Sequence, residues 1–123
     1  NIEANTMVYM TRHMYLPALF DYSGDIATSV ATKAELGIDA KAEKKMVSVL
    51  TDGINAISDA VDDLEAKNAQ AKGLEDPQAA DDCYRDVVIP AMTALRTAVD
   101  DMEKVCGHDY WPVPSYNKML FYV

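Results

Sequence analysis

The sequence has few of the residues that break helices and few that build disulfide frameworks. It contains five glycines, five prolines and two cysteines among 123 residues. Such a composition, with alanine, aspartate, valine and lysine recurring throughout, favours helices over a turn-rich β fold. Half of the residues are hydrophobic. The chain is therefore predicted to fold, and its length suits one domain with a modest core.

Long apolar runs are also missing, since none approaches the ~18 residues that a membrane-spanning helix needs. No basic segment followed by an apolar one opens the chain, as it would in a secretory leader.

There is no initiator Met, and an amphipathic pattern begins directly after Asn1. Cys83 and Cys106 fall on one predicted helix, roughly 35 Å apart at 1.5 Å per residue, which is beyond disulfide reach. We expect a cytoplasmic fragment of a longer chain.

Positive charge is scarce, because 11 basic residues face 20 acidic ones and the net charge is −9. Residues 46–103 hold 13 acidic and 4 basic residues, so the whole excess lies in the middle of the chain. An acidic surface repels phosphate backbones and anionic lipid headgroups. Nucleic acids and membranes are therefore not expected as partners.

Apolar or small residues recur at helical spacing along two segments. The first of these segments carries Leu50, Ile54, Ile57, Val61, Leu64 and Asn68, in steps of 4 and 3. The other carries Tyr84, Val88, Ala91, Leu95, Ala98, Met102 and Val105. Such stripes predict helices packed along their length, over 40–72 and 77–106. Asp39 and Asp76 are predicted N-caps, Pro77 suits the first helical position, and Gly73 suits a left-handed C-terminal residue.

A further helix is predicted over 2–36, closed by Gly37, with a looser apolar stripe and methionines on another face. Pro17 in this helix and Pro90 in the third remove backbone donors, so both helices are expected to kink. The two prolines are expected at similar heights along the bundle. Residues 16–19 (LPAL) and 89–92 (IPAM) resemble each other, although one such similarity is equally compatible with chance. The short connectors force antiparallel neighbours. The predicted fold is all-α, a single domain (1–123) built as an antiparallel bundle of three long helices.

The last segment, 107–123, is predicted to be an extended aromatic tail, because Pro112 and Pro114 forbid a helix. Nine of the ten aromatic residues lie in 9–22 or 110–122. Large apolar surface at the ends of the bundle should be covered. The tail is expected to fold back on its own bundle or to dock on another chain or domain. Its candidate interface residues are Tyr110, Trp111, Pro112, Pro114, Tyr116, Leu120 and Phe121.

Residues that could carry chemistry form no recognisable catalytic or metal-binding pattern. A di-metal carboxylate bundle needs Glu-x-x-His pairs, but Met10 and Val105 stand three residues before the two histidines, His13 and His108. Adjacent aspartates on a helix point about 100° apart, so they do not converge on one substrate. Arg85 is close to Cys83 in the sequence but no histidine is, and both cysteines are expected to be buried and inert. No catalytic, cofactor or metal residue is predicted on this chain.

Three stretches of this chain resemble the C-terminal region of type III glutamine synthetases, the long-chain bacterial form. Residues 2–7 followed by 16–18 are similar to that family's EAxTM and ILPA motifs. Residues 87–103 resemble its V-P-A-M-x-x-L-R segment. Residues 110–121 resemble its closing YWPxPxYxxLLF motif, with Val113 where phenylalanine is expected. The closing motif is the most specific of the three, and the helix at 40–72 is matched only in type.

The resemblance implies a parent enzyme that joins ammonia to glutamate with ATP and a divalent metal such as Mg. In that family the catalytic, nucleotide and metal residues lie upstream, so none is carried over to this chain. The family forms stacked rings of twelve subunits. The resemblance therefore implies a helical accessory and assembly domain, with the catalytic domain and neighbouring subunits as partners. The alternatives are a stand-alone helical interaction module and, last, a small helical enzyme.

Overall fold

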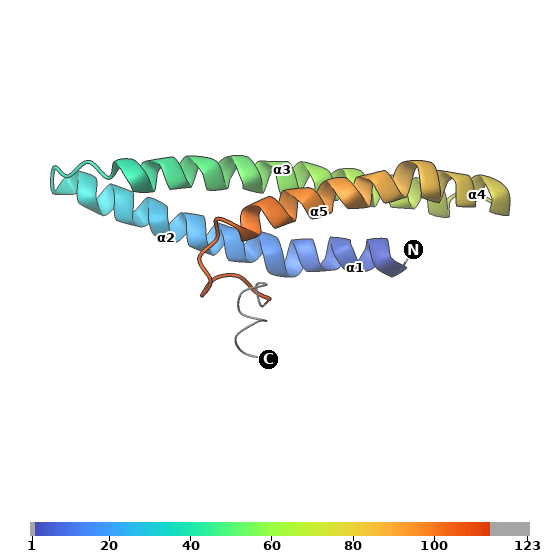
Figure 1. The fold of residues 1–123 in the computed structure, drawn as a ribbon, viewed down its shortest axis with the longest axis horizontal. Coiled ribbons are helices and arrows are strands. Elements are labelled where there is room, and N and C mark those ends of the chain that lie inside the picture. The colour runs from blue at the N-terminus through green and yellow to red at the C-terminus, as the bar shows by residue number, and fades with distance from the viewer. Residues whose placement is uncertain (1, 114–123) are drawn as a thin grey trace.

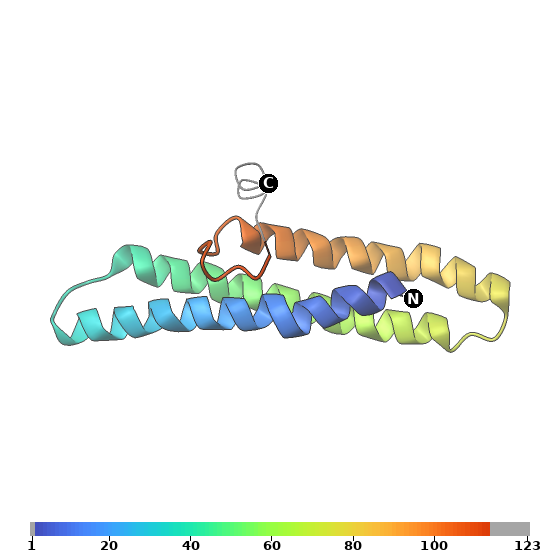
Figure 2. The ribbon, with the colours of Figure 1, turned by 90° about the horizontal axis from the view of Figure 1, so that it is seen from below.

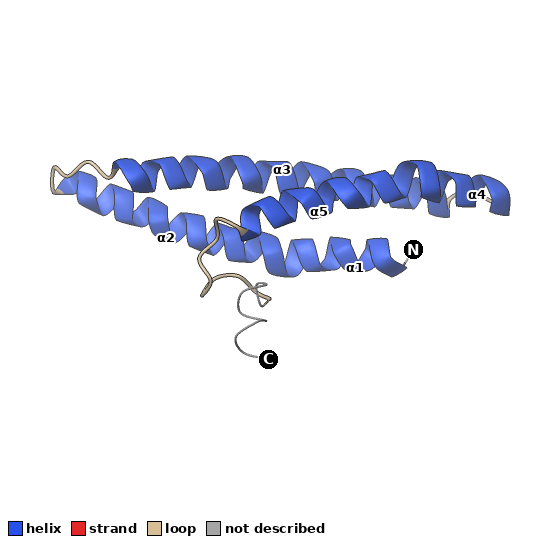
Figure 3. Ribbon diagram, in the orientation of Figure 1, coloured by secondary structure: helices blue, strands red, loops and turns tan. Residues whose placement is uncertain are grey.

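The computed structural model describes residues 2–113, and within that range it consists of helices and loops without a strand (Figure 3). The first helix comprises α1 (Ile2–Met10), the π-helical turn η1 (Thr11–Tyr15) and α2 (Leu16–Glu35). The second helix is α3 (Lys41–Lys72). The third helix comprises α4 (Pro77–Cys83), the π-helical turn η2 (Tyr84–Val88) and α5 (Ile89–Glu103). The three predicted helices are thus present, and the third ends three residues earlier than expected.

The second helix is the centre of the arrangement. Figures 1 and 2 show the three helices running side by side along one long axis, each reversing direction at a short connector. Both α2 and α5 pack along α3, whereas the first and third helices approach each other far less closely. None of the described helices is long and apolar enough to cross a bilayer.

The predicted apolar stripes form the core. On α3, Leu50, Ile57, Val61 and Leu64 are fully buried, and Ile54 is partly buried. The polar member of the stripe, Asn68, is also buried and donates through its amide to Asn5 Oδ1 of α1 at 3.0 Å. A buried polar pair of this kind favours one register of neighbouring helices, because a shifted register would leave its groups without partners.

Each internal proline directly follows a π-helical turn. The N–H of Leu16 donates to the carbonyl of Thr11, and that of Ile89 donates to the carbonyl of Tyr84, in both cases five residues back. Pro17 and Pro90 then stand second in α2 and α5. A π turn inserts one residue into the helix and shifts the backbone bonding that proline interrupts. The predicted kinks stay predictions.

The two prolines do not lie at similar heights in the bundle, and that expectation is wrong. Residues of η1 lie opposite Leu95 and Asp100 rather than opposite η2. The first and third helices begin at different levels along the long axis (Figure 1), so equal positions in the sequence pattern are not level in space.

The helix ends confirm three predicted signals, at Asp76, at Pro77 as the first residue of α4 and at Gly37, and contradict two. Asp76 caps α4 by accepting from the N–H of Ala79 at 3.1 Å, and Gly37 has the left-handed φ of 76°. Asp39 does not cap α3: Ala40 occupies that position, and the Asp39 carboxylate pairs with Lys44 at 3.0 Å. Gly73 is right-handed, with φ −77°. Its N–H still reaches the carbonyl of Ala69, so the helix ends without a left-handed residue.

The chain after α5 turns back toward the first helix (Figure 2). The N–H groups of Tyr110 and Trp111 both donate to the carbonyl of Gly107. Residues 107–111 therefore form a turn where an extended path was expected, because this turn comes before the two prolines can impose one. The remainder of the predicted tail lies outside the described residues.

Candidate functional site

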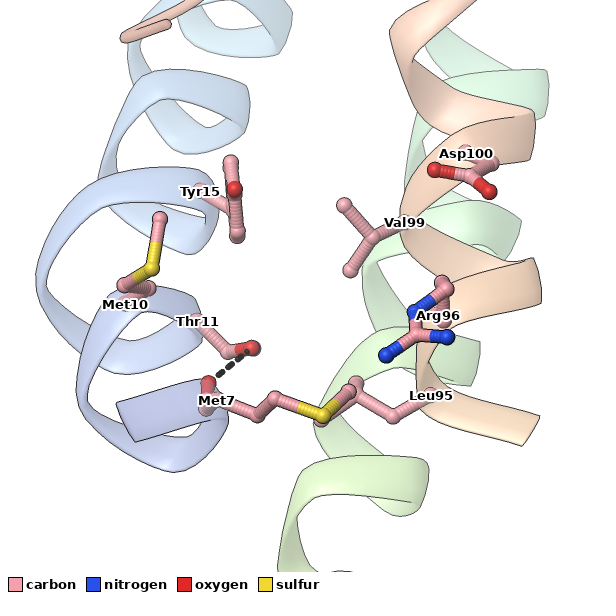
Figure 4. A pocket seen from close by; sticks show the side chains of 8 residues that line it. All are labelled: Met7, Met10, Thr11, Tyr15, Leu95, Arg96, Val99 and Asp100. Carbon is pink, nitrogen blue, oxygen red and sulfur yellow. Dashed lines mark hydrogen bonds between the residues drawn. The ribbon is translucent and has the colours of Figure 1, made fainter. Parts of the chain in front are cut away.

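A cavity of about 240 Å³ lies between the first helix and α5 (Figure 4). Its walls are mostly apolar side chains, with a few polar groups. The residues that line it are Met7, Met10, Thr11, Tyr15, Leu95, Arg96, Val99 and Asp100. The cavity exists because the two outer helices both pack on α3 and leave space between themselves.

The π turn η1 supplies two of the cavity's polar side chains. Thr11 is buried, and its hydroxyl donates to the carbonyl of Met7 at 2.7 Å (Figure 4), so its hydrogen-bonding need is met within the helix. Burial raises the pKa of Tyr15 above its usual value, and the carboxylates of Glu103 and Asp100 add to the effect. The phenol of Tyr15 therefore stays neutral near pH 7 and can act as a hydrogen-bond donor.

Arg96 and Asp100 lie one helical turn apart on α5, at the exposed edge of the cavity. Figure 4 shows the guanidinium of Arg96 extending from α5 toward the first helix. Neither side chain forms an ion pair within the part of the chain that the structure describes. Their order explains this. On a helix, an acidic residue four positions before a basic one pairs better than the reverse, and here the basic Arg96 comes first.

The described start of the tail covers the neighbouring part of the first helix. The indole of Trp111 is buried and stacks on Tyr15, with ring centroids 5.2 Å apart. Tyr110 packs against Tyr22 at 4.9 Å, and its hydroxyl donates to Asp25 Oδ2 at 2.6 Å. We call these five residues the tail seat.

One buried polar group of the tail seat lacks a partner. The indole Nε1 of Trp111 has no acceptor among the residues that the structure describes. A buried donor without an acceptor costs roughly 1–3 kcal/mol. The stacked ring and the apolar burial of the indole offset this cost, so the Trp111 contact is held by its ring rather than by its N–H.

The predicted interface residues fall into three groups. Tyr110 and Trp111 contact their own bundle, while Pro112 is exposed. Four others, Pro114, Tyr116, Leu120 and Phe121, lie outside the described residues. Docking on another chain or domain stays a prediction.

Both cysteines are free and buried, as expected. Burial also raises the pKa of the Cys106 thiol, so little thiolate is present near neutral pH. Within residues 2–113, no three His, Cys, Asp or Glu side chains are grouped so that they could hold a metal ion.

Sequence reasoning found the tail but missed its seat. The sequence did contain a signal for these contacts, because the aromatic residues gather in two distant stretches, 9–22 and 110–122. Each ring pair of the tail seat joins one residue from each stretch. The cavity had no such signal. Met7 and Met10 share one face of the predicted first helix, which does not by itself indicate a cavity. Nothing in the spacing of Arg96 and Asp100 separates them from other exposed charges on α5.

The chain is similar to part of a type-3 glutamine synthetase from Dictyostelium discoideum. The two are 27% identical over 126 aligned residues, which cover 98% of this chain and 17% of the relative. This chain thus spans about a sixth of the length of that relative. No family model matches the chain. No solved structure matches it either.

Proposed function

We propose that this chain is a helical accessory domain of a glutamine synthetase, supporting subunit assembly without carrying catalytic residues itself. The observation that carries the proposal is the alignment of 98% of the chain with a segment of a type-3 glutamine synthetase. Because that segment is 17% of the relative, the reaction chemistry is assigned to the rest of the parent polypeptide. ATP and Mg are accordingly assigned there, together with the ligation of ammonia to glutamate.

The tail seat supports an assembly role. It holds an aromatic segment against the bundle through two ring contacts and one short hydrogen bond. Aromatic side chains carry much of the binding energy in subunit interfaces. A seated tail holds the exposed Pro112 in one place, where the catalytic region or a neighbouring subunit can bind it.

The test is Trp111→Ala in the full parent polypeptide, with the oligomer size measured by light scattering. Loss of the indole should loosen residues 107–113 and shift the protein toward smaller assemblies. Leu74→Ala is the control, because it also truncates a large apolar side chain but does so at an exposed position in the connector after α3. An unchanged assembly in the Trp111 variant would count against the assembly role.

A stand-alone helical interaction module is the second candidate. It is favoured by the cavity between the first helix and α5 and by large apolar side chains that are exposed on the first helix, Ile2, Tyr9 and Phe20. This candidate requires a native polypeptide of about this chain's own length. A cytoplasmic location is proposed for either candidate on the basis of the free cysteines.

A further inference from the structure

The three helices leave one position of a four-helix arrangement open. The first and third helices each pack along α3 and approach each other far less closely. A four-helix bundle fills the corresponding position with a helix that contacts both outer helices. Here the tail seat covers one part of that position, and the cavity beside Tyr15 occupies the next part.

We propose that an amphipathic helix from elsewhere in the parent polypeptide docks in this open position. It would lie over the cavity, with apolar side chains against Met7, Met10 and Val99. These walls are suitable because methionine side chains are flexible and adapt to an incoming surface. A cavity of about 240 Å³ leaves room for apolar side chains of that helix. Filling the cavity would restore the contacts that its lining atoms now lack.

The charges at the rim specify the chemistry of the occupant. Arg96 and Asp100 are exposed, stand one turn apart and form no ion pair with the described residues. A helix that carries an acidic residue facing Arg96 and a basic residue facing Asp100 would pair with both. Complementary charges at the edge of an interface fix register and orientation more than they add affinity.

The parent polypeptide is the natural source of such a helix. The matched relative is about six times as long as the segment that aligns with this chain, so most of its residues lie outside that segment. A helix tethered in the same polypeptide has a high effective concentration at the open position of the bundle. The inference rests on the proposed function only in requiring a longer parent polypeptide, and it does not depend on which reaction that polypeptide catalyses.

Site-specific photo-crosslinking in the purified parent tests the inference. The photoreactive amino acid p-benzoylphenylalanine is placed at Met10 in one variant and at Arg96 in a second. Arg96 is exposed, so this second variant tolerates the substitution even if the first folds poorly. A third variant carries the probe at Asp59, an exposed position on α3, as the control. Peptides joined to the probe are identified by mass spectrometry.

The expected result is that Met10 and Arg96 crosslink to one shared peptide outside the region aligned with this chain, and that Asp59 does not. Introducing Arg96→Glu should reduce the crosslink from Met10. Crosslinks confined to this chain's own residues, to a second copy of it, to a separate protein or to nothing would each overturn the inference. A crosslinked parent that forms no glutamine would refute the proposed function and leave the inference standing.

Discussion

The indole ring of Trp111 stacks on the phenol ring of Tyr15, with their planes inclined by 22°. Tyr15 is the last residue of the π turn η1, and it also lines the cavity between the first helix and α5. One aromatic contact therefore joins three features of the molecule. They are the π turn before Pro17, the described first part of the tail (107–113), and the cavity on the open side of the bundle. Changes at Trp111 should be felt at all three.

Trp111→Ala should lower the free energy of unfolding by about 3 kcal/mol, the lower end of what truncating a buried tryptophan costs. Trp111 is 8% exposed, so the variant would leave a shallow void beside Tyr15 that the tail fills only in part. Urea denaturation followed by circular dichroism measures the change. Trp111→Phe keeps an aromatic ring for the stack and should lose less. Equal stability of Trp111→Ala and the unmodified chain would show that the tail seat contributes little.

Gly53→Ala should destabilise the bundle although alanine is the better helix former. A Cβ at position 53 would overlap the side chain of Met102, which packs across α3 at this point. Met102 is buried, so its side chain has little room to move aside, and overpacking of this kind costs about 1–3 kcal/mol against the ~1 kcal/mol gained in helix propensity. In a Met102→Ala background the same change should stabilise instead. Thermal unfolding of the unmodified chain, the two single variants and the double variant gives the coupling free energy between the two positions. Purely additive effects would contradict the predicted overlap.

Asp76→Ala should cost about 1 kcal/mol of stability, because it removes the acceptor for the N–H of Ala79 at the start of α4. Asp39→Ala serves as the matched control. It loses an exposed ion pair with Lys44 and no cap, so the expected cost is at most about 0.5 kcal/mol. Denaturant midpoints of the two variants should differ accordingly. Equal losses would mean that Asp39 supports its helix in a way that the cap geometry does not reveal.

The tail seat should loosen at alkaline pH. The hydrogen bond to Asp25 raises the pKa of Tyr110 above its usual value near 10, so the folded state holds this proton more tightly than the unfolded chain does. Its stabilising effect is therefore complete below about pH 10 and is lost as pH rises through the folded pKa. Trp111 is the single tryptophan, and its fluorescence should shift to the red over that range.

Tyr110→Phe is the control for this titration. The variant lacks the bond to Asp25, so its emission should already lie further to the red near pH 8 and should change less on going to about pH 12. The remaining change would come from Tyr15, whose pKa is raised mainly by burial. A titration of Tyr110→Phe that coincides with the unmodified protein would contradict the role assigned to the Tyr110–Asp25 bond.

Periodicity was enough to predict the three helices, because residues such as Leu50, Ile57 and Leu64 recur at the spacing that one buried helix face requires. The ends were harder. Asp39 and Gly73 belong to residue types that favour caps, yet Asp39 pairs with Lys44 while Ala40 occupies the N-cap position, and Gly73 keeps a right-handed backbone. The cavity was not predictable, since it depends on how far apart the outer helices lie on α3, and no local pattern encodes that separation.

The most direct test of the account is the mass and activity of the native polypeptide that contains this sequence, purified with an antibody against α3. The account predicts a polypeptide several times heavier than the 13.5 kDa of this chain, which forms glutamine from glutamate, ammonia and ATP. A native polypeptide of about 13.5 kDa with no such activity would contradict it, and would leave a stand-alone helical interaction module as the function of this chain.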